Sequence, residues 1–312
     1  AISQHYQDYY GERIDHNRVI ITTGSSTGFI LSFLSCFDVG DKVGLTAPGY
    51  PAYRNILQSI GCIPIEISVD ETTDFQPTPE ILDKLDDKLD GLIIASPNNP
   101  TGTMLKRKEL QALIDYCDQQ EIRFISDEIY HGITYERKAD TAVSMGKDVV
   151  IINSFSKYFS MTGWRLGWIV VPEEMVRAVE CLAQNLFISA PTLSQFAGVE
   201  ALKCSDELDQ YVANYARNRA LLLKKLPEIG FSKLAPCDGA FYVYADVSHI
   251  SDDAMSLCKE ILNTTGVAVT PGVDFDVLKG HHYIRFSYAG QFEEIKQACD
   301  RLEKFMKLKL MS

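Results

Sequence analysis

The stretch Ser154-Phe155-Ser156-Lys157-Tyr158-Phe159-Ser160-Met161-Thr162-Gly163-Trp164-Arg165-Leu166-Gly167-Trp168 decides which fold we expect for this chain. Small hydroxyl residues flank Lys157, and an apolar run at 149–152 leads into the stretch. A buried strand that ends on hydroxyls and a lysine can present an amine beside an anion site. This suits a cofactor that carries an aldehyde and a phosphate. Lys157 would form a Schiff base with the aldehyde, and Ser154, Ser156 and Arg165 would hold the phosphate. An ordinary basic loop after a strand is the alternative interpretation.

The composition is that of a large acidic globular protein. The chain has 312 residues, of which 46% are hydrophobic, and this length predicts two domains. Its 30 Lys and Arg against 42 Asp and Glu give a formal net charge of −12. An acidic chain has no sequence-wide attraction to nucleic acid or to an anionic membrane, so we expect neither partner. No apolar stretch approaches the ~20 residues that a membrane span needs.

The cysteines and histidines do not suggest a disulfide framework or a metal site. The eight cysteines are scattered without a C-x-x-C pair, which is typical of reduced thiols and predicts a cytoplasmic protein. His281 and His282 have no nearby carboxylate or cysteine at ligand spacing, so we expect a surface loop and no metal. Residues 1–11 resemble the last turns of an amphipathic helix and lack the features of a signal peptide.

Short apolar runs alternate with helical patterns along the first two thirds of the chain. Strands are predicted at 19–22, 42–46, 63–69, 91–95, 123–126, 149–153 and 166–171. Helices are predicted between them, for example at 24–37 and at 108–119. This alternation, with strands that are almost continuously apolar, predicts a mostly parallel sheet covered by helices on both sides.

The pattern changes towards the end of the chain. A long helix is predicted at 206–226, just before Pro227. After it come predicted strands at 239–245 and 283–287 and predicted helices at 253–262 and 292–306. We therefore expect a large domain at residues 1–207 and a small C-terminal α+β domain at residues 208–312.

Three further polar segments each follow a predicted strand. Residues 22–28 open a helix, whose free N–H groups beside Ser25 and Ser26 can cradle a phosphate, although a simple helix cap would look the same. The stiff loop Ser96-Pro97-Asn98-Asn99-Pro100-Thr101-Gly102-Thr103 lies where open α/β sheets bind ligands. In Ser126-Asp127-Glu128-Ile129-Tyr130-His131, Asp127 can pair with a protonated ring nitrogen, or it can cap a helix. His131 is expected only to pack.

Together these four segments resemble the class I/II aminotransferases, the fold-type I family that uses pyridoxal 5′-phosphate (PLP). The motifs S-P-N-N-P-T-G, D-E-I-Y and S-F-S-K…G-W-R-L-G stand in the family's order with similar gaps, and the similarity runs over nearly the whole chain. The surroundings of Lys157 resemble the bacterial branch. The resemblance implies the α/β PLP-dependent transferase fold of type I, with a mostly parallel seven-stranded sheet between helices and a smaller C-terminal α+β domain.

The resemblance also implies a role for each residue that would act on the reacting atoms. Lys157 would be the Schiff-base lysine and would carry a proton between the substrate and the cofactor. Asp127 would pair with the pyridine nitrogen, and Asn99 and Tyr130 would hydrogen-bond the phenolic oxygen of the ring. Arg285 would take the substrate α-carboxylate as a bidentate pair, and Asn99 would contact the substrate as well.

The remaining cofactor contacts follow from the same resemblance. Tyr50 would stack on the cofactor ring, with Tyr53 as the competing candidate. The phosphate would be held by Ser25, Ser26, Ser154, Ser156 and Arg165. The family often has cis peptides at the positions of Ala47–Pro48 and Asn99–Pro100, so we expect at least one cis bond there. The segment that normally precedes the family's first helix is absent, so we expect a fragment or an ordered part of a longer chain.

The implied activity is transfer of the amino group of an L-amino acid to a 2-oxo acid, 2-oxoglutarate or pyruvate, in two half-reactions. A C–S lyase of the same fold would share the residues that serve the cofactor and is one alternative. A catalytically silent PLP-binding regulatory domain is the other, and the acidic charge argues against it. A homodimer is expected from the family. The amino acid substrate stays open, because no second basic residue for a substrate side-chain carboxylate can be placed.

Overall fold

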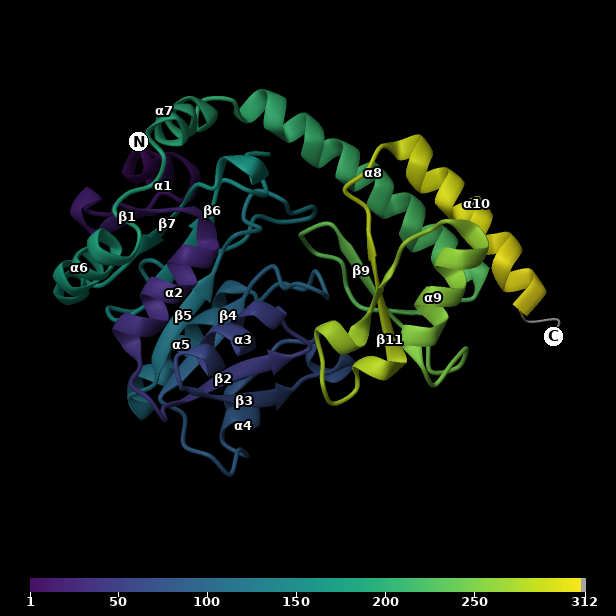
Figure 1. Ribbon diagram of the computed structural model, residues 1–312, viewed down its shortest axis with the longest axis horizontal. Helices are drawn as coiled ribbons and strands as arrows, with labels where there is room; N and C mark the ends of the chain where they lie inside the picture. Colours follow the sequence, from purple (N-terminus) through teal and green to yellow (C-terminus); the bar gives the residue numbers. More distant parts are fainter. Residues whose placement is uncertain (310–312) are drawn as a thin grey trace.

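A seven-stranded sheet lies at the centre of the larger lobe in the computed structural model, which describes residues 1–309 (Figure 1). Its order is β1-β7-β6-β5-β4-β2-β3. The strands are β1 (Val19–Thr22), β2 (Lys42–Ala47), β3 (Ile63–Ser68), β4 (Gly91–Ala95), β5 (Arg123–Asp127), β6 (Val150–Ser154) and β7 (Gly167–Val170). Only β7 runs against its neighbours, so the predicted mostly parallel sheet of seven strands is confirmed.

Helices cover both faces of this sheet, which explains why its central strands are apolar along their whole length. Consecutive residues of β6 show the two faces. Ile151 packs in the cluster that contains Leu113 of α5, whereas Ile152 packs in the cluster that contains Phe33 of α2. The helices of this lobe are α1 (Ile2–Tyr10), α2 (Gly24–Cys36), α3 (Pro51–Ser59), α4 (Pro79–Leu82), α5 (Arg107–Gln120), α6 (Val176–Leu186) and α7 (Thr192–Ala201).

A second, four-stranded antiparallel sheet forms the smaller lobe, in the order β10-β11-β9-β8. Its elements are β8 (Lys233–Leu234), β9 (Tyr242–Asp246), α9 (Ala254–Thr265), β10 (Thr270–Pro271), β11 (Tyr283–Ser287) and α10 (Phe292–Lys309). The strand predicted from residue 239 begins only at Tyr242. Ala240 adopts a positive φ of 56°, which takes the chain out of the extended conformation.

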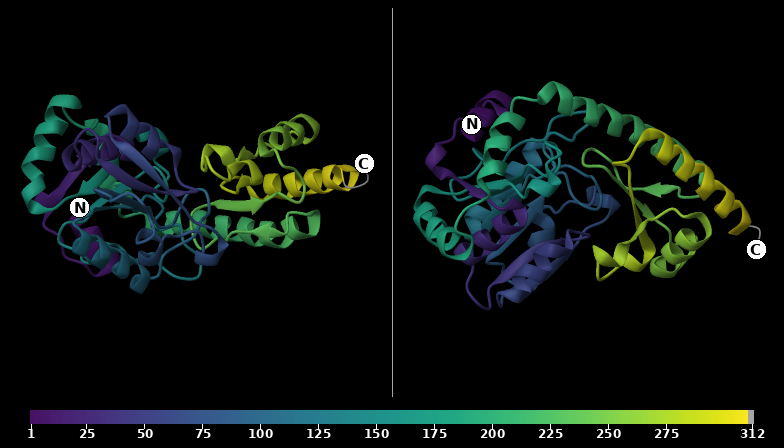
Figure 2. Two further views of the ribbon diagram at one scale, coloured as in Figure 1. Left: turned by 90° about the horizontal axis from the view of Figure 1, so that it is seen from below. Right: turned by 45° about the horizontal axis from the view of Figure 1, so that its top comes forward.

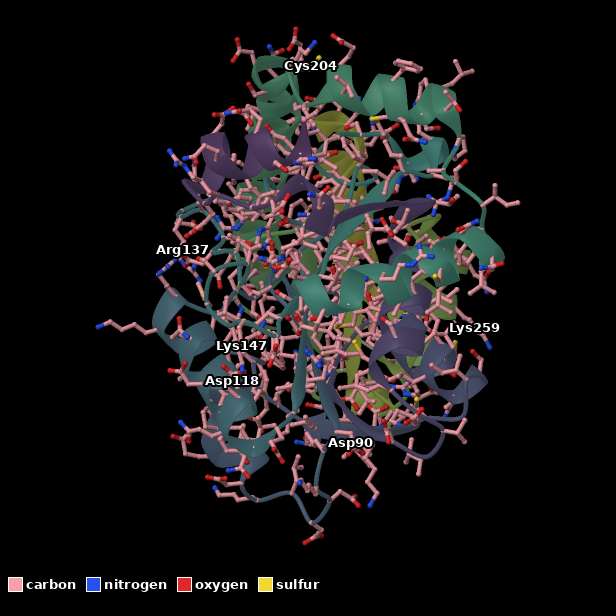
Figure 3. The ribbon with its side chains drawn as sticks, turned by 90° about the vertical axis from the view of Figure 1, so that its left-hand side faces the viewer. Asp90, Asp118, Arg137, Lys147, Cys204 and Lys259 are labelled. Atoms are coloured by element: carbon pink, nitrogen blue, oxygen red, sulfur yellow. The ribbon has the colours of Figure 1, made fainter. Side chains whose placement is uncertain are left out.

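The long helix α8 (Ser205–Ile229) joins the two lobes and runs along one edge of the molecule (Figures 1 and 2). Figure 3 shows Cys204, between α7 and α8, at the end of the molecule where this connection starts. The helix was expected to stop before Pro227 but includes it, because Pro227 lies in the last turn and Gly230 then donates its N–H to the Leu226 carbonyl. The predicted boundary between residues 207 and 208 falls within α8 and stays a prediction.

Among residues 1–309, no helix combines the length and the apolarity that a membrane span requires.

Candidate functional site

A cavity of about 330 Å³ lies between the two sheets, and every predicted site residue except Ser154 lines it. The first sheet contributes residues at or just after the carboxyl ends of its parallel strands: Tyr50 after β2, Asn99 after β4, Asp127 at the end of β5 and Lys157 after β6. The smaller lobe contributes Arg285 from β11. A larger cavity of about 860 Å³ beside α1 contains none of the predicted residues.

Ser154 is the one predicted site residue outside the cavity lining, and its role at the phosphate stays a prediction. It is buried, its hydroxyl lies 3.4 Å from the carbonyl oxygen of Leu166, and its Oγ accepts the backbone N–H of Ser156 at 3.0 Å. Ser154 therefore holds the turn that presents Ser156 and Lys157, instead of facing the cavity itself. The sequence did not indicate this hydrogen bond, because a strand pattern does not show which way its last residue points when the chain turns.

One end of the cavity is built to receive an anion. Ser25 and Ser26 lie in the first turn of α2, and no side chain caps this helix. Gly24 has a φ of +76°, and a Cβ there would lie 2.6 Å from Nη2 of Arg165, so glycine lets the guanidinium come close to the helix start. Nη1 of Arg165 donates to the carbonyl of Thr162 at 2.8 Å. Free N–H groups, the helix dipole and an arginine together fit a phosphate group.

Asp127 is a buried carboxylate at the far side of the cavity. Its Oδ1 accepts the N–H of Ile129 at 3.0 Å, and its Oδ2 accepts the hydroxyl of Tyr53. Burial raises the pKa of Asp127 to about 6, although these hydrogen bonds and Lys157 oppose the shift. A buried carboxylate of this kind fits a protonated ring nitrogen, which would supply the missing positive charge.

Tyr50 and Tyr53 occupy different places. Tyr50 is half-buried and lines the cavity, and its role as the stacking aromatic stays a prediction. Tyr53 is buried behind it, with the two rings edge to face at 5.4 Å between centroids, and donates to Asp127. From the sequence, Tyr53 was considered only as a stacking candidate, because the spacing of residues does not show that α3 contacts the end of β5.

Lys157 brings an amine into the middle of the cavity. Its Nζ lies 5.5 Å from the ring centroid of Tyr130 and 5.8 Å from that of Phe241. Burial lowers the pKa of Lys157, and Arg285 and Arg165 lower it further while Asp127 opposes them. A lysine with a lowered pKa holds more of the neutral amine, which is the form that attacks an aldehyde.

Arg285 is held on several sides but keeps a donor for a ligand. Nη1 donates to Oδ1 of Asn99 at 2.7 Å, and Nη2 lies 3.4 Å from Oγ1 of Thr270. The guanidinium carbon lies 4.2 Å from the ring centroid of Tyr242. Among the described residues, the buried Nε has no hydrogen-bond partner. An unpaired buried donor in a cavity points to an acceptor such as a carboxylate.

A hydrogen-bonded network around His131 was not predicted. His131 Nε2 lies 2.9 Å from the carbonyl oxygen of Ser96, and its Nδ1 lies 2.8 Å from the hydroxyl of Tyr10. Because a carbonyl only accepts, Nε2 carries the proton and Nδ1 accepts from Tyr10. Burial lowers the pKa of His131 to about 4, so the ring is neutral at neutral pH. His131 thus packs as expected and also ties α1 to the loop that carries Asn99.

Two X-Pro peptide bonds of the described residues are cis. The Ala47–Pro48 bond is cis, which confirms that at least one of the two named bonds is. In the loop after β4 the cis bond precedes Pro97 instead of Pro100. His281 and His282 belong to a short 3₁₀ turn, and residues 1–309 contain no cluster of three or more side chains that could hold a metal ion.

The buried carboxyl group of Glu128 is expected to make the stability of the folded protein depend on pH. Its Oε1 accepts from Ser126, Thr141 and the N–H of Ala142, whereas burial raises its pKa from 4.5 to about 8. The folded protein then keeps a proton that the unfolded chain loses near pH 4.5, so stability falls as pH rises from about 5 to 8. We expect Glu128→Gln to remove up to about 1.4 kcal/mol per pH unit of this slope, because the amide carries no titrating proton.

Urea unfolding of the cofactor-free protein at a series of pH values measures this slope. Glutamine keeps the acceptor at Oε1 and places its NH₂ where Oε2 now lies, 3.5 Å from Nδ1 of His131. The exposed Glu174→Gln is the matched control and should leave the slope unchanged. Parallel slopes for the wild type and Glu128→Gln would contradict the prediction.

Comparison with known proteins adds an independent observation. The sequence profile of the family Aminotransferase class I and II matches residues 1–302. The valine–pyruvate aminotransferase of Mycobacterium tuberculosis is 47% identical over 310 residues, which are 98% of this chain and 80% of that protein. A (5-formylfuran-3-yl)methyl phosphate transaminase of Methanocaldococcus jannaschii is 36% identical over 98% of this chain and 80% of its own length.

Solved structures agree with the sequence relatives. The crystal structure of an aminotransferase from Mycobacterium tuberculosis superimposes with a TM-score of 0.96 at 47% identity, covering 98% of this chain and 80% of that one. A fit of this quality extends over both sheets and the helix between them.

Proposed function

The chain belongs to the class I and II aminotransferases, and from this premise we propose that the cavity between its sheets is the active site of an enzyme that transfers the amino group of a neutral L-amino acid to pyruvate. The family makes the chain a PLP-dependent transaminase of fold type I, and its relative at 47% identity is bacterial. No relative named above favours the lyase or the silent regulatory domain. The residue roles and the substrate preference are inferred from the cavity.

The residues that would hold the cofactor line the cavity in four groups, one for each part of PLP that they would contact. When bound, PLP supplies an aldehyde that captures amines and a ring that withdraws electrons from the substrate α-carbon. The helix start with Ser25, Ser26, Ser156 and Arg165 would hold its phosphate. Asp127 would bind the ring nitrogen, Asn99 and Tyr130 the phenolic oxygen, and Tyr50 one face of the ring.

Lys157 and Arg285 would handle the substrate. Arg285 binds the α-carboxylate through its paired donors and so fixes the direction of the bond to the α-hydrogen. Burial lowers the pKa of the Lys157 amine. This amine would take the proton from the α-carbon of the substrate and deliver it to the aldehyde carbon of the cofactor. Asp127 keeps a negative charge beside the ring nitrogen in the buried end of the site, which stabilises a proton there.

The preference for neutral amino acids rests on one observation, the small number of cations in the cavity. Among the described residues that line it, the basic side chains are Lys157, Arg165 and Arg285. Arg165 serves the phosphate and Arg285 the α-carboxylate, so no cation is left for a carboxylate on the substrate side chain. The name of the valine–pyruvate aminotransferase relative supports the same preference and suggests pyruvate as the acceptor.

The test is amino-group transfer by the PLP-loaded protein with single substrates. We expect the kcat/KM for L-valine with pyruvate to exceed that for L-aspartate or L-glutamate by at least about tenfold, because an unpaired carboxylate in the pocket costs more than 1.4 kcal/mol. Pyruvate should likewise exceed 2-oxoglutarate as acceptor. A preference for dicarboxylic substrates would refute the neutral-substrate proposal. Release of ammonia and pyruvate from cystathionine would instead indicate lyase activity.

The enzyme is further proposed to be a homodimer, with its contact on a patch formed by Leu186, Ile188, Leu193 and Phe196. Ile188, Leu193 and Phe196 are 81%, 79% and 71% exposed, which is unusual for apolar side chains so close together. The patch adjoins the phosphate end of the cavity, because Ser194 donates its hydroxyl to the carbonyl of Trp164, one residue before Arg165. A second copy of this chain would therefore cover the apolar surface and shield the anion site.

Charging the patch should separate the subunits. We expect the double variant Leu193→Glu, Phe196→Glu to have half the solution mass of the wild type in analytical ultracentrifugation, because each buried carboxylate would be desolvated without a partner. Val39→Glu, at a site 83% exposed in the connection between α2 and β2, is the control and should leave the mass unchanged. A wild type that is already monomeric at micromolar concentration would contradict the proposal.

A cytoplasmic location is proposed as well. It is supported by the cysteines, all eight of which are free thiols in the described part of the chain.

A further inference from the structure

We propose that Tyr242 is a further positioning residue of this active site. Its ring seats the guanidinium of Arg285 for the substrate carboxylate, and its hydroxyl aims the hydroxyl of Tyr130 at the phenolic oxygen of the cofactor. The inference rests on the proposed function of the cavity. Tyr242 would connect Arg285, which binds the substrate carboxylate, to Tyr130, which hydrogen-bonds the cofactor.

The strand pairing places Tyr242 next to Arg285. Tyr242 starts β9, and Arg285 lies on the neighbouring strand β11, opposite Tyr244. Tyr242 is therefore the diagonal neighbour of Arg285 on the same face of the sheet, within reach of a long side chain. The guanidinium carbon lies 4.2 Å from the Tyr242 ring centroid, a distance at which a cation is attracted to an aromatic face.

This stacking fixes where the donors of Arg285 point. A second ring, Phe275, has its centroid 4.6 Å from the guanidinium carbon. Asn99 accepts from Nη1, while the buried Nε has no partner among the described residues. An arginine held by two rings loses little further rotamer freedom when a carboxylate binds. The affinity of Arg285 for the substrate carboxylate therefore depends on these rings.

The hydroxyl of Tyr242 makes the second link. It lies 2.7 Å from the hydroxyl of Tyr130, and both side chains are buried and line the cavity. A phenol can donate one hydrogen bond and accept others. When Tyr242 donates, the oxygen of Tyr130 is engaged and its own proton is left for an acceptor in the cavity. Without Tyr242, the hydroxyl of Tyr130 is free to rotate away from that acceptor.

The bland interpretation is that Tyr242 is an ordinary core aromatic, and the chain offers a matched control. Tyr244 lies two residues along β9 and is 1% exposed. Its hydroxyl has no hydrogen-bond partner among the described residues, and its ring stacks on Tyr283 at 4.8 Å instead of on a guanidinium. If burial alone mattered, removing the hydroxyl from either tyrosine would have the same effect.

The experiment compares Tyr242→Phe, Tyr242→Leu and Tyr244→Phe with the wild type, all loaded with PLP. The first measurement is a pH titration of the visible absorption of the bound cofactor. A weaker hydrogen bond to the phenolic oxygen disfavours its deprotonated form. We therefore expect Tyr242→Phe to raise the apparent pKa of the chromophore by about half a unit or more, and Tyr244→Phe to leave it unchanged.

The second measurement is the Kd of isovalerate, a carboxylate with the carbon skeleton of valine and no amino group. Tyr242→Leu should raise this Kd by about tenfold, since it removes the ring under Arg285, whereas Tyr242→Phe keeps the ring and should change it by less than about twofold. Identical chromophore titrations for Tyr242→Phe and Tyr244→Phe would overturn the role of the hydroxyl.

An isovalerate Kd in Tyr242→Leu equal to that of the wild type would overturn the role of the ring. If Tyr242→Leu does not fold, the chromophore titration of Tyr242→Phe decides the inference by itself. Failure of the proposed function looks different: the wild type would then show neither PLP absorption nor transamination. If only this inference fails, the wild type is active and the titrations of Tyr242→Phe and Tyr244→Phe are the same.

Discussion

Lys157→Ala should lower the kcat of transamination by at least about 10⁴-fold, because it removes both the amine that binds the cofactor aldehyde and the group that moves the proton. Among the described residues that line the cavity, Lys157 carries the only primary amine. The remaining cations that line it, Arg165 and Arg285, are guanidinium groups, which cannot form a Schiff base with the cofactor aldehyde in place of the amine.

Separate measurements of binding and turnover check this prediction. The variant should still bind PLP, because Ser25, Ser26 and Arg165 would keep the phosphate, but its visible absorption should differ from that of the wild type. Lys147→Ala is the control, because Lys147 is 86% exposed and does not line the cavity; the residue is labelled in Figure 3. Wild-type turnover by Lys157→Ala would refute the assignment of the site.

Asp127→Asn should lower kcat by roughly 10³-fold while leaving the cofactor-free protein at least as stable as the wild type. The activity falls because a neutral amide no longer stabilises a proton on the ring nitrogen. Stability does not fall, because burial raises the pKa of Asp127 from 3.8 to about 6. The folded state thus binds a proton more tightly than the unfolded chain, so the carboxylate destabilises the folded protein above that pH, and asparagine removes this cost.

Activity and unfolding free energy at pH 7 are the two measurements, and they should move independently. Asp118→Asn, on the exposed side of α5 and labelled in Figure 3, is the control for the same chemical change. If Asp127→Asn lost activity and stability together, the aspartate would act mainly through folding. Unchanged activity would show that no ring nitrogen depends on it.

The first sheet and its site residues were largely predictable from sequence, for a physical reason. A strand buried on both faces must be apolar along its length, so β4, β5 and β6 stand out, and the polar residue that ends such a strand lies at the ligand-binding edge. Asp127 and Lys157 were found in this way. The direction of a strand leaves no mark on its composition, and nothing in its sequence distinguishes the antiparallel β7 from its parallel neighbours.

Contacts between elements that are distant in sequence were not predictable. The hydrogen bond from Tyr53 to Asp127 depends on how α3 packs against the sheet, and the stacking of Tyr242 on Arg285 depends on the pairing of β9 with β11. Of the pair Tyr242 and Arg285, only Arg285 was assigned, through the resemblance of its strand to the family. The hydrogen bond from the N–H of Ser156 to Oγ of Ser154 was not predictable either, because it depends on how the backbone turns after β6.

The order in which the cavity residues occur in the chain has a consequence for synthesis of the protein. Ser25 is made well before Arg285, yet both line one cavity. At translation rates of about 5–20 residues per second, a nascent chain therefore remains without a complete ligand site until β11 has left the ribosome. From then on PLP binds the folded form preferentially, and by mass action its free concentration sets how much of the finished chain escapes unfolding and degradation.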